Sequence, residues 1–154
     1  MSGPDGLARV VAADCPAGWL DKSMTVYSAP PVANRAMSPN IVVSRDHLGP
    51  NETFREYCNR QYAAFRTSLP GFEREAESFG RVGERDAFQV QMIWESAAGT
   101  LRQRVFFVDA SPVIVNYAAS AAADDWAAHE AMFMAGLAGL QIDVPAAAGK
   151  RCDP

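Results

Sequence analysis

The 154-residue sequence lacks the signatures of the common enzyme classes. It has no glycine-rich nucleotide loop, no Gly-x-Ser-x-Gly turn, no His-Glu-x-x-His zinc motif and no paired Cys-x-x-Cys sequence. Only two histidines, His47 and His129, are available for acid–base or metal chemistry. We therefore expect a protein that binds a partner and is not an enzyme, and we expect no cofactor and no metal.

Cysteine is scarce, and long apolar runs are missing. Cys15, Cys58 and Cys152 are an odd number without metal-ligand spacing, which is not typical of a disulfide framework and fits a reducing compartment. No apolar run reaches the roughly 20 residues that a membrane-spanning helix needs. The start of the sequence lacks the basic residues and the apolar stretch of a signal peptide. Together these features predict a cytoplasmic protein.

Positive charge does not dominate the sequence either. The formal net charge is −4, and Lys and Arg form no cluster. Because affinity for nucleic acid depends mainly on neutralising phosphates, we expect no nucleic-acid partner.

The length and the 49% hydrophobic content suit one folded domain. We expect a flexible start over residues 1–6, one domain over 7–142 and a flexible tail over 143–154.

Alternating apolar residues separated by turn residues predict a series of strands. Phe88, Val90, Met92 and Trp94 alternate with polar residues on one such strand. The even spacing of the turns predicts an antiparallel meander. The expected strands cover residues 7–13, 23–28, 40–46, 72–80, 87–94, 100–109 and 112–119.

Two helices are expected between and after these strands. Thr53 and Glu56 have capping-box spacing, and Pro70 with Gly71 ends the first helical pattern. Asp124 and Asp125 start the second helix, at the end where the helix dipole favours negative charge. One face of this second helix carries Trp126, Phe133, Leu137 and Leu140. The order of elements predicts an α+β fold with one antiparallel sheet and two main helices.

Several expected strands are apolar on both faces, notably at 41–43, 105–108 and 113–115. Strands of this kind are usually covered on both sides. Two helices are few for that task. The loop over 30–39, a second subunit or a ligand is expected to cover the remaining face.

A few polar residues are candidates for chemistry or binding. Cys58 with a histidine would be a minimal reactive pair, but Cys58 lies on the apolar side of its helix, where a buried thiol is usually inert. His129 with Glu130 would be a minimal metal pair, although one histidine and one neighbouring carboxylate rarely make a metal site. Gln61 and Gln103 lie within apolar patterns. Each is either a rim residue bonded to water or backbone, or a polar point inside an apolar binding surface.

Four segments resemble one known family in their order and spacing. They are Trp-Leu-Asp-Lys-Ser-Met-Thr-Val at 19–26, Asn-Ile-Val-Val-Ser-Arg-Asp at 40–46, Arg-Gln-Tyr at 60–62 with Leu-Pro-Gly-Phe at 69–72, and Leu-Arg-Gln-Arg at 101–104. Over residues 8–142 the sequence resembles the DcrB-like family, and within it most resembles the Eag-type chaperones that accompany type VI secretion effectors. The resemblance implies a fold related to PsbP-like proteins.

The resemblance also implies a function and a site. Eag-type chaperones are cytoplasmic bacterial homodimers that shield the N-terminal transmembrane helices of an effector, often an Rhs/PAAR-type toxin, and help load it on the secretion spike. An envelope-associated DcrB-like or PsbP-like accessory protein is the alternative function, and it would need an export signal. The positions that the resemblance assigns to helix binding are Met24, Val26, Ile41, Gln61, Phe65, Leu69, Leu101 and Gln103.

Overall fold

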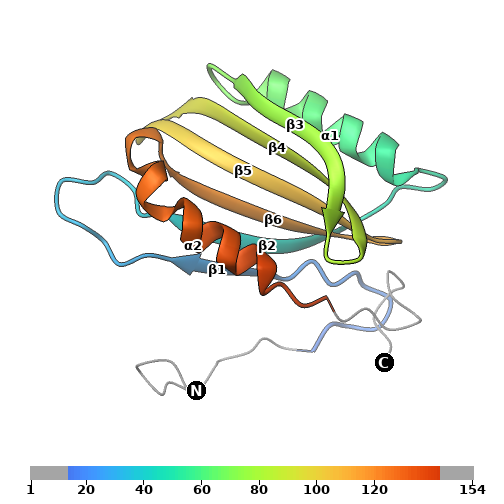
Figure 1. Ribbon diagram of the computed structural model, residues 1–154. Helices are drawn as coiled ribbons and strands as arrows, with labels where there is room; N and C mark the ends of the chain where they lie inside the picture. Colours follow the sequence, from blue (N-terminus) through green and yellow to red (C-terminus); the bar gives the residue numbers. More distant parts are fainter. Residues whose placement is uncertain (1–13, 143–154) are drawn as a thin grey trace.

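The computed structural model describes residues 14–142 (Figure 1). The expectations for the first six residues, for a strand at 7–13 and for a tail at 143–154 lie outside the described residues. Within them, one antiparallel sheet has the strand order β1-β2-β6-β5-β4-β3. Its strands are β1 (Met24–Ser28), β2 (Asn40–His47), β3 (Glu73–Val82), β4 (Arg85–Ser96), β5 (Gly99–Ala110) and β6 (Val113–Ala122).

The second half of the sheet is the predicted meander. Short turns connect β3 to β4 and β4 to β5. A glycine with a positive φ lies at each, Gly83 at 60° within the first turn and Gly99 at 109° as the first residue of β5. Residues with a side chain rarely adopt a positive φ, so glycine is favoured at both positions. The chain then returns through β6, whose free edge pairs with β2. The N-terminal strands therefore extend the meander on its β6 side.

Helix α1 (Phe54–Ser68) begins with the predicted capping box. The Glu56 backbone N–H donates to the Thr53 hydroxyl at 3.1 Å, and the Thr53 N–H donates to the Glu56 carboxylate at 3.0 Å. The helix ends before Pro70 and Gly71, as expected. Helix α2 (Trp126–Ala138) follows a short 3-10 turn over Ala123–Asp125, so the second helix also starts at the two aspartates.

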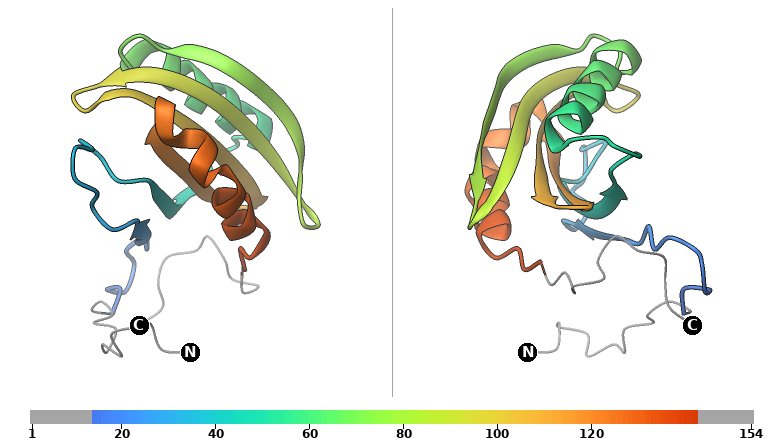
Figure 2. Two further views of the ribbon diagram at one scale, coloured as in Figure 1. Left: turned by 60° about the vertical axis from the view of Figure 1, so that its left-hand side comes forward. Right: turned by 90° about the vertical axis from the view of Figure 1, so that its right-hand side faces the viewer.

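The two helices lie on opposite faces of the sheet (Figure 2). The core under α1 contains Tyr57 and Cys58 from the helix with Phe88, Val90 and Phe107 from the sheet. Trp126, Phe133 and Leu137 of α2 pack on Phe106, Val108, Tyr117 and Ala119. Strand β5 is therefore covered on both sides, which accounts for the apolar run at 105–108.

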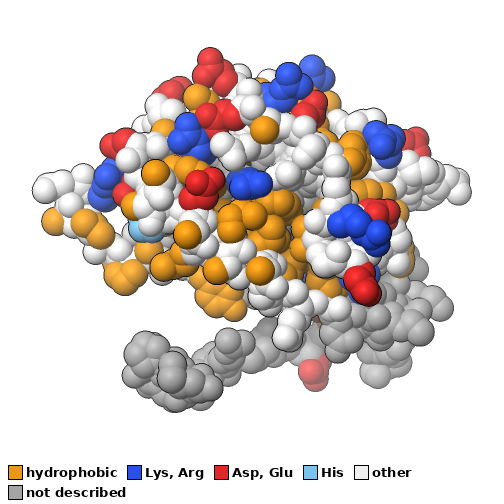
Figure 3. All heavy atoms as spheres, in the orientation of Figure 1, with side chains coloured by type: hydrophobic (Ala, Val, Ile, Leu, Met, Phe, Trp, Pro, Cys, Tyr) orange, Lys and Arg blue, Asp and Glu red, His pale blue; other side chains and the backbone are white. Residues whose placement is uncertain are grey.

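Helix α2 approaches the sheet closely. The Tyr117 hydroxyl donates to the carbonyl of Phe133 at 2.7 Å. A Cβ atom on Gly136 would lie 2.5 Å from that hydroxyl and 3.4 Å from Cδ1 of Ile41, so only glycine fits at this position. On this side of the molecule, hydrophobic side chains gather between α2 and the β3–β4 hairpin (Figure 3). The α+β fold with one antiparallel sheet and two helices is confirmed.

Candidate binding surface

The register of the N-terminal strands places three apolar side chains on the α1 side of the sheet. Val26 pairs with Val42, and Val42 pairs with Ala118, which packs against the core under α1. Directly paired residues in antiparallel strands share a face, and residues two apart on one strand share it too. Met24 and Val26 of β1, Val42 of β2 and Ala118 of β6 therefore lie on one face.

This part of the face is not covered by any element of residues 14–142. Helix α1 packs over β4 and β5, where the Phe65 ring stacks on Phe107 with 6.1 Å between centroids. Beyond it, Met24 is 63% exposed and Val26 is 55% exposed, and Val42 is half-buried. We name this region the open α1-side surface and define it by Met24, Val26, Val42, Ser44, Asn116 and Ala118.

The two candidate glutamines differ in what they already bond. The Gln103 amide joins three strands, because the Trp94 indole N–H donates to its oxygen at 2.6 Å and its nitrogen donates to the Ser120 hydroxyl at 2.7 Å. Gln61 is half-buried in α1, and its amide makes no hydrogen bond among the described residues. Gln61 therefore has its full set of donors and acceptors available to a ligand, and Gln103 only a part.

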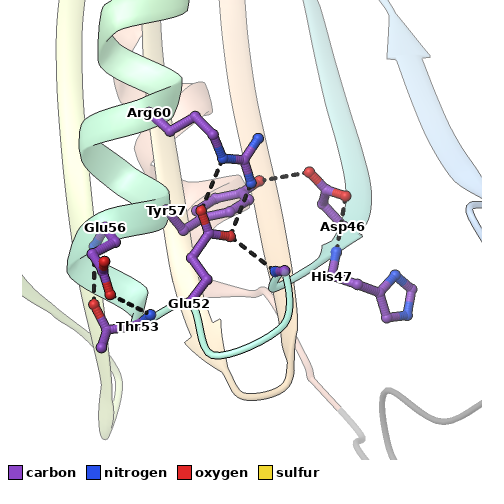
Figure 4. A network of polar contacts seen from close by, with 8 residues as sticks. Asp46, His47, Glu52, Thr53, Glu56, Tyr57 and Arg60 are labelled. Atoms are coloured by element: carbon purple, nitrogen blue, oxygen red, sulfur yellow. Dashed lines mark hydrogen bonds and ion pairs between the residues drawn. The ribbon is translucent and has the colours of Figure 1, made fainter.

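Gln61 stands one helical turn from Tyr57 and one from Phe65, on the inner side of α1. The Tyr57 hydroxyl donates to the Asp46 carboxylate of β2 at 3.0 Å, so this side of the helix is turned toward β2 (Figure 4). A further buried acceptor lies nearby on β6. The side-chain oxygen of Asn116 is buried and accepts no hydrogen bond within the described structure. A ligand beside α1 could bond the Gln61 amide, whereas the Asn116 oxygen is buried beneath the surface.

A polar network holds the start of α1 against β2 (Figure 4). Arg60 donates to both Glu52 oxygens at 2.9 and 3.0 Å, and the Gly49 N–H donates to the same carboxylate. The Arg60 hydrogen bonds, with that from Gly49, lower the pKa of Glu52 to about 2. Burial and the nearby Asp46 carboxylate raise the pKa of Tyr57, so its hydroxyl stays a donor. The network fixes the helix flank that carries Gln61.

One predicted site residue lies on the other face. Ile41 pairs with Tyr27 and Ala119, and it packs in the core under α2. The expectation that Ile41 shares a surface with Met24 and Val26 is wrong. Ile41 pairs with Tyr27, which follows Val26 on β1, and neighbouring residues on one strand point to opposite faces. Val42 takes its place on the open α1-side surface. Residues 41–43 are all apolar, so alternation did not indicate which of them faces α1.

The remaining predicted site residues lie on the α1 side but belong largely to the core. Phe65 and Leu69 pack against the cluster under α1. Leu101 is 8% exposed and pairs with Trp94 and Ala122. Their roles in helix binding stay predictions, and a ligand would reach only the rim of these side chains.

The reactive pairs considered from the sequence are separated in space. Cys58 is buried under α1, and burial raises the pKa of its thiol to about 12, which leaves it protonated and unreactive at neutral pH. His129 lies on α2, on the opposite face, where it contacts Asp125 at 3.2 Å. Residues 14–142 contain no group of three or more potential metal ligands. Cys15 is disulfide-bonded, which the odd cysteine count did not lead us to expect.

No helix within residues 14–142 has the length and hydropathy required to span a membrane.

Comparisons with known proteins agree with this architecture. The DcrB family model matches residues 12–137. Effector EagT6 of Pseudomonas aeruginosa is 24% identical over 102 residues, which cover 66% of this chain and 70% of that protein.

Solved structures share the fold. The crystal structure of PA94, a protein of unknown function from Pseudomonas aeruginosa, has a TM-score of 0.77 at 19% identity and covers 90% of this chain and 96% of its own. The cyanobacterial PsbP (CyanoP) of Synechocystis sp. PCC 6803 has a TM-score of 0.50 at 11% identity, over 79% of this chain and 93% of its own. The expectation of a PsbP-like and DcrB-like fold is confirmed.

Proposed function

This chain belongs to the DcrB family, and from that premise we propose that it is an accessory chaperone of a type VI secretion effector. The distant similarity to Effector EagT6 supports the Eag-type branch of the family. The observation that carries the proposal is the open α1-side surface, where Met24 and Val26 are exposed beside Val42. In this role the protein works by binding, without a catalytic step, a cofactor or a metal.

The proposed ligand is an N-terminal transmembrane helix of the effector. Such a helix is apolar on all sides and aggregates in water unless it is shielded. Apolar contact with Met24, Val26 and Val42 removes surface from water at about 25 cal/mol per Å², against the cost of association. Apolar contacts tolerate sequence changes, so one surface can hold helices that differ in detail.

Uncharged amides suit such a ligand. The free Gln61 amide offers hydrogen bonds without the cost of burying a charge. Serine, threonine and backbone groups of a helix would orient the ligand through these contacts. The apolar residues then supply most of the affinity, and the amides fix the position.

The resemblance to Eag-type chaperones implies two copies of the chain. Strands that are apolar on both faces also favour a second subunit as a cover for part of the sheet. We therefore expect a homodimer, and light scattering that gives twice the 16.6 kDa of one chain is the corresponding measurement.

Neighbouring residues on β1 provide a matched test. Val26 faces the open α1-side surface, and Thr25 next to it is also exposed but points to the opposite face. Val26→Asp places a carboxylate against an apolar helix, whereas Thr25→Asp places it away from the ligand. We expect Val26→Asp, and not Thr25→Asp, to lose co-purification with a fragment carrying the N-terminal membrane helices of the cognate effector. Equal recovery of the fragment by both folded variants would rule out this surface.

A further inference from the structure

A cavity lies on the face of the sheet opposite to the open α1-side surface. Its volume is about 570 Å³, and it lies between α2 and the β3–β4 hairpin. Val82, Phe106 and Leu137 supply apolar walls. The charged residues of the lining are three arginines and one carboxylate, namely Arg81, Arg85, Arg104 and Glu84. In the space-filling view, hydrophobic side chains gather here with basic side chains at their border (Figure 3). We name this cavity the hairpin pocket.

Arg104 is positioned in the hairpin pocket without a carboxylate. Its Nε and Nη2 atoms both donate to the Gln89 side-chain oxygen, at 3.1 and 2.8 Å, and its Nη1 lies 3.3 Å from the Met134 sulfur. The guanidinium also stands 5.2 Å from the centre of the Phe106 ring. These neutral partners hold the side chain in place and leave its charge unbalanced. A guanidinium has five N–H donors, so it can still bind an anion.

Arg85 adds a second cation. It is half-buried opposite Val82, and its side chain has no ion pair or hydrogen bond among the described residues. Arg102, two positions before Arg104 on the same face, shows the usual arrangement and donates to both oxygens of Glu75 at 2.7 and 2.8 Å. Among the residues that line the pocket, three arginines therefore face one carboxylate, Glu84, so the lining carries an excess of positive charge in a chain whose net charge is −4.

We propose that the hairpin pocket docks an acidic segment of a partner protein. Separate carboxylates of the segment lie on Arg104 and Arg85, and a large apolar side chain between them lies on Phe106. Arginine binds carboxylates through paired hydrogen bonds, which are stronger than those between neutral groups. A cavity of about 570 Å³ has room for a few side chains of a peptide and not for a whole helix.

The surroundings favour a protein over a small molecule. The outer face of α2 beside the pocket is exposed and mostly uncharged, and Met132 on it is 69% exposed. A partner that fills the pocket can therefore continue its contact along α2. The pocket and the open α1-side surface lie on opposite faces of the sheet, so both ligands can bind at once.

Peptide pools test the charge preference directly. The ¹⁵N-labelled protein is titrated with heptapeptides that alternate Leu, Phe or Met with Asp or Glu, and with a matched pool that carries Asn or Gln instead. We expect the acidic pool to shift the amide signals of Val82, Gln89 and Arg104, and the neutral pool to shift them far less. Arg85→Gln breaks no described bond, so it should fold and weaken binding of the acidic pool about tenfold. Arg74→Gln, an exposed arginine paired with Glu77, is the control and should bind like the wild type.

Four outcomes would overturn the proposal. The first is an equal shift of the pocket signals by both pools, and the second is a shift by the acidic pool of only the open α1-side surface or of nothing. The third is wild-type binding of the acidic pool by folded Arg85→Gln and Arg104→Gln. The fourth is a wild-type dimer that Arg85→Glu dissociates, because the occupant would then be a second copy. Loss of effector-helix binding with intact binding of the acidic pool would contradict only the function proposed above.

Discussion

Ile41 and Val42 are neighbours on β2, and their side chains lie on opposite faces of the sheet. Ile41 packs under α2 near Gly136 and Tyr117, and Val42 lies on the open α1-side surface. The same change of side chain should therefore have a different effect at each position. Single substitutions at this pair separate folding from binding.

We expect Ile41→Asp to destabilise the fold and Val42→Asp to abolish helix binding. A carboxylate at position 41 would be buried among apolar side chains without a partner, at a cost of about 3 kcal/mol. At position 42 it would remain in contact with water until a ligand arrives. Urea denaturation and co-purification with the effector's membrane helices measure the two effects. A stable Ile41→Asp protein that loses the helices, with normal binding by Val42→Asp, would reverse the assignment of the two faces.

The two glutamines on the α1 side should also behave differently. Gln103→Leu leaves the Trp94 indole N–H and the buried Ser120 hydroxyl without their present partner, at a cost of about 1–2 kcal/mol in the free energy of unfolding. Gln61→Leu removes no hydrogen bond of the described structure, so stability should hardly change while binding of the effector helix weakens. Chemical denaturation and binding assays on both variants check this contrast. Equal losses of stability would show that the Gln61 amide has a partner within the protein.

At the scale of elements, the start of α1 depends on a charged pair. The Arg60 and Gly49 bonds to Glu52 lower the pKa of this carboxyl from 4.5 to about 2. A carboxyl with a lowered pKa in the folded state contributes stability above its unfolded pKa, and loses that contribution as the pH falls through the folded pKa. The contribution of Glu52 should therefore be complete at pH 7 and disappear between about pH 4.5 and pH 2.

Thermal unfolding of the wild type and of Glu52→Gln across this range measures the effect. We expect the wild type to have the higher midpoint at pH 7, and the two midpoints to converge as the pH falls toward 2. Glu95→Gln, at an exposed carboxylate in β4, provides a control for the general effect of removing one negative charge. A difference between wild type and Glu52→Gln that stays constant down to pH 2 would show that the pair does not determine it.

Local sequence patterns predicted the positions of the helices and strands well. They did not predict which distant strands pair or which face each strand residue occupies. The capping box at Thr53 and the helix end before Pro70 and Gly71 are short-range signals, and each is found where the sequence placed it. Which strand pairs with β2 depends on contacts between distant residues, and a shift of one residue exchanges the two faces. The apolar stretch 41–43 gives no alternation, so the face of Ile41 was predicted wrongly.

The sequence also did not predict that the arginines of the hairpin pocket line one cavity. Arg85 and Arg104 are 19 positions apart, and neither stands in a basic cluster. They line the same cavity because β4 and β5 are neighbours and α2 covers part of that face. That three arginines and only one carboxylate, Glu84, line this cavity became apparent only from the folded arrangement of residues 14–142. For Arg104, Gln89 takes the place of an acidic partner.

At the scale of the whole molecule, the sheet separates two surfaces of different chemistry. The α1 side offers apolar side chains and neutral amides, and the α2 side offers apolar walls with two arginines. Since α1 and α2 pack on opposite faces, a ligand on one side does not overlap a ligand on the other (Figure 2). A protein built in this way can hold an apolar helix and an acidic partner together.

Two substitutions, one on each face, should therefore have independent effects. Val42→Asp should abolish binding of the effector helices and leave the response to the acidic peptide pool unchanged, while Arg85→Gln should do the reverse. Changes at distant sites without shared partners usually add, so the double variant should lose both activities and retain the stability that the single variants predict. Salt gives a second distinction, because 0.5 M NaCl screens the carboxylate–arginine contact and not the apolar one. If Val42→Asp also weakens the acidic peptides, or if salt releases the helices as readily as the peptides, the two faces act as one site and this division of tasks is wrong.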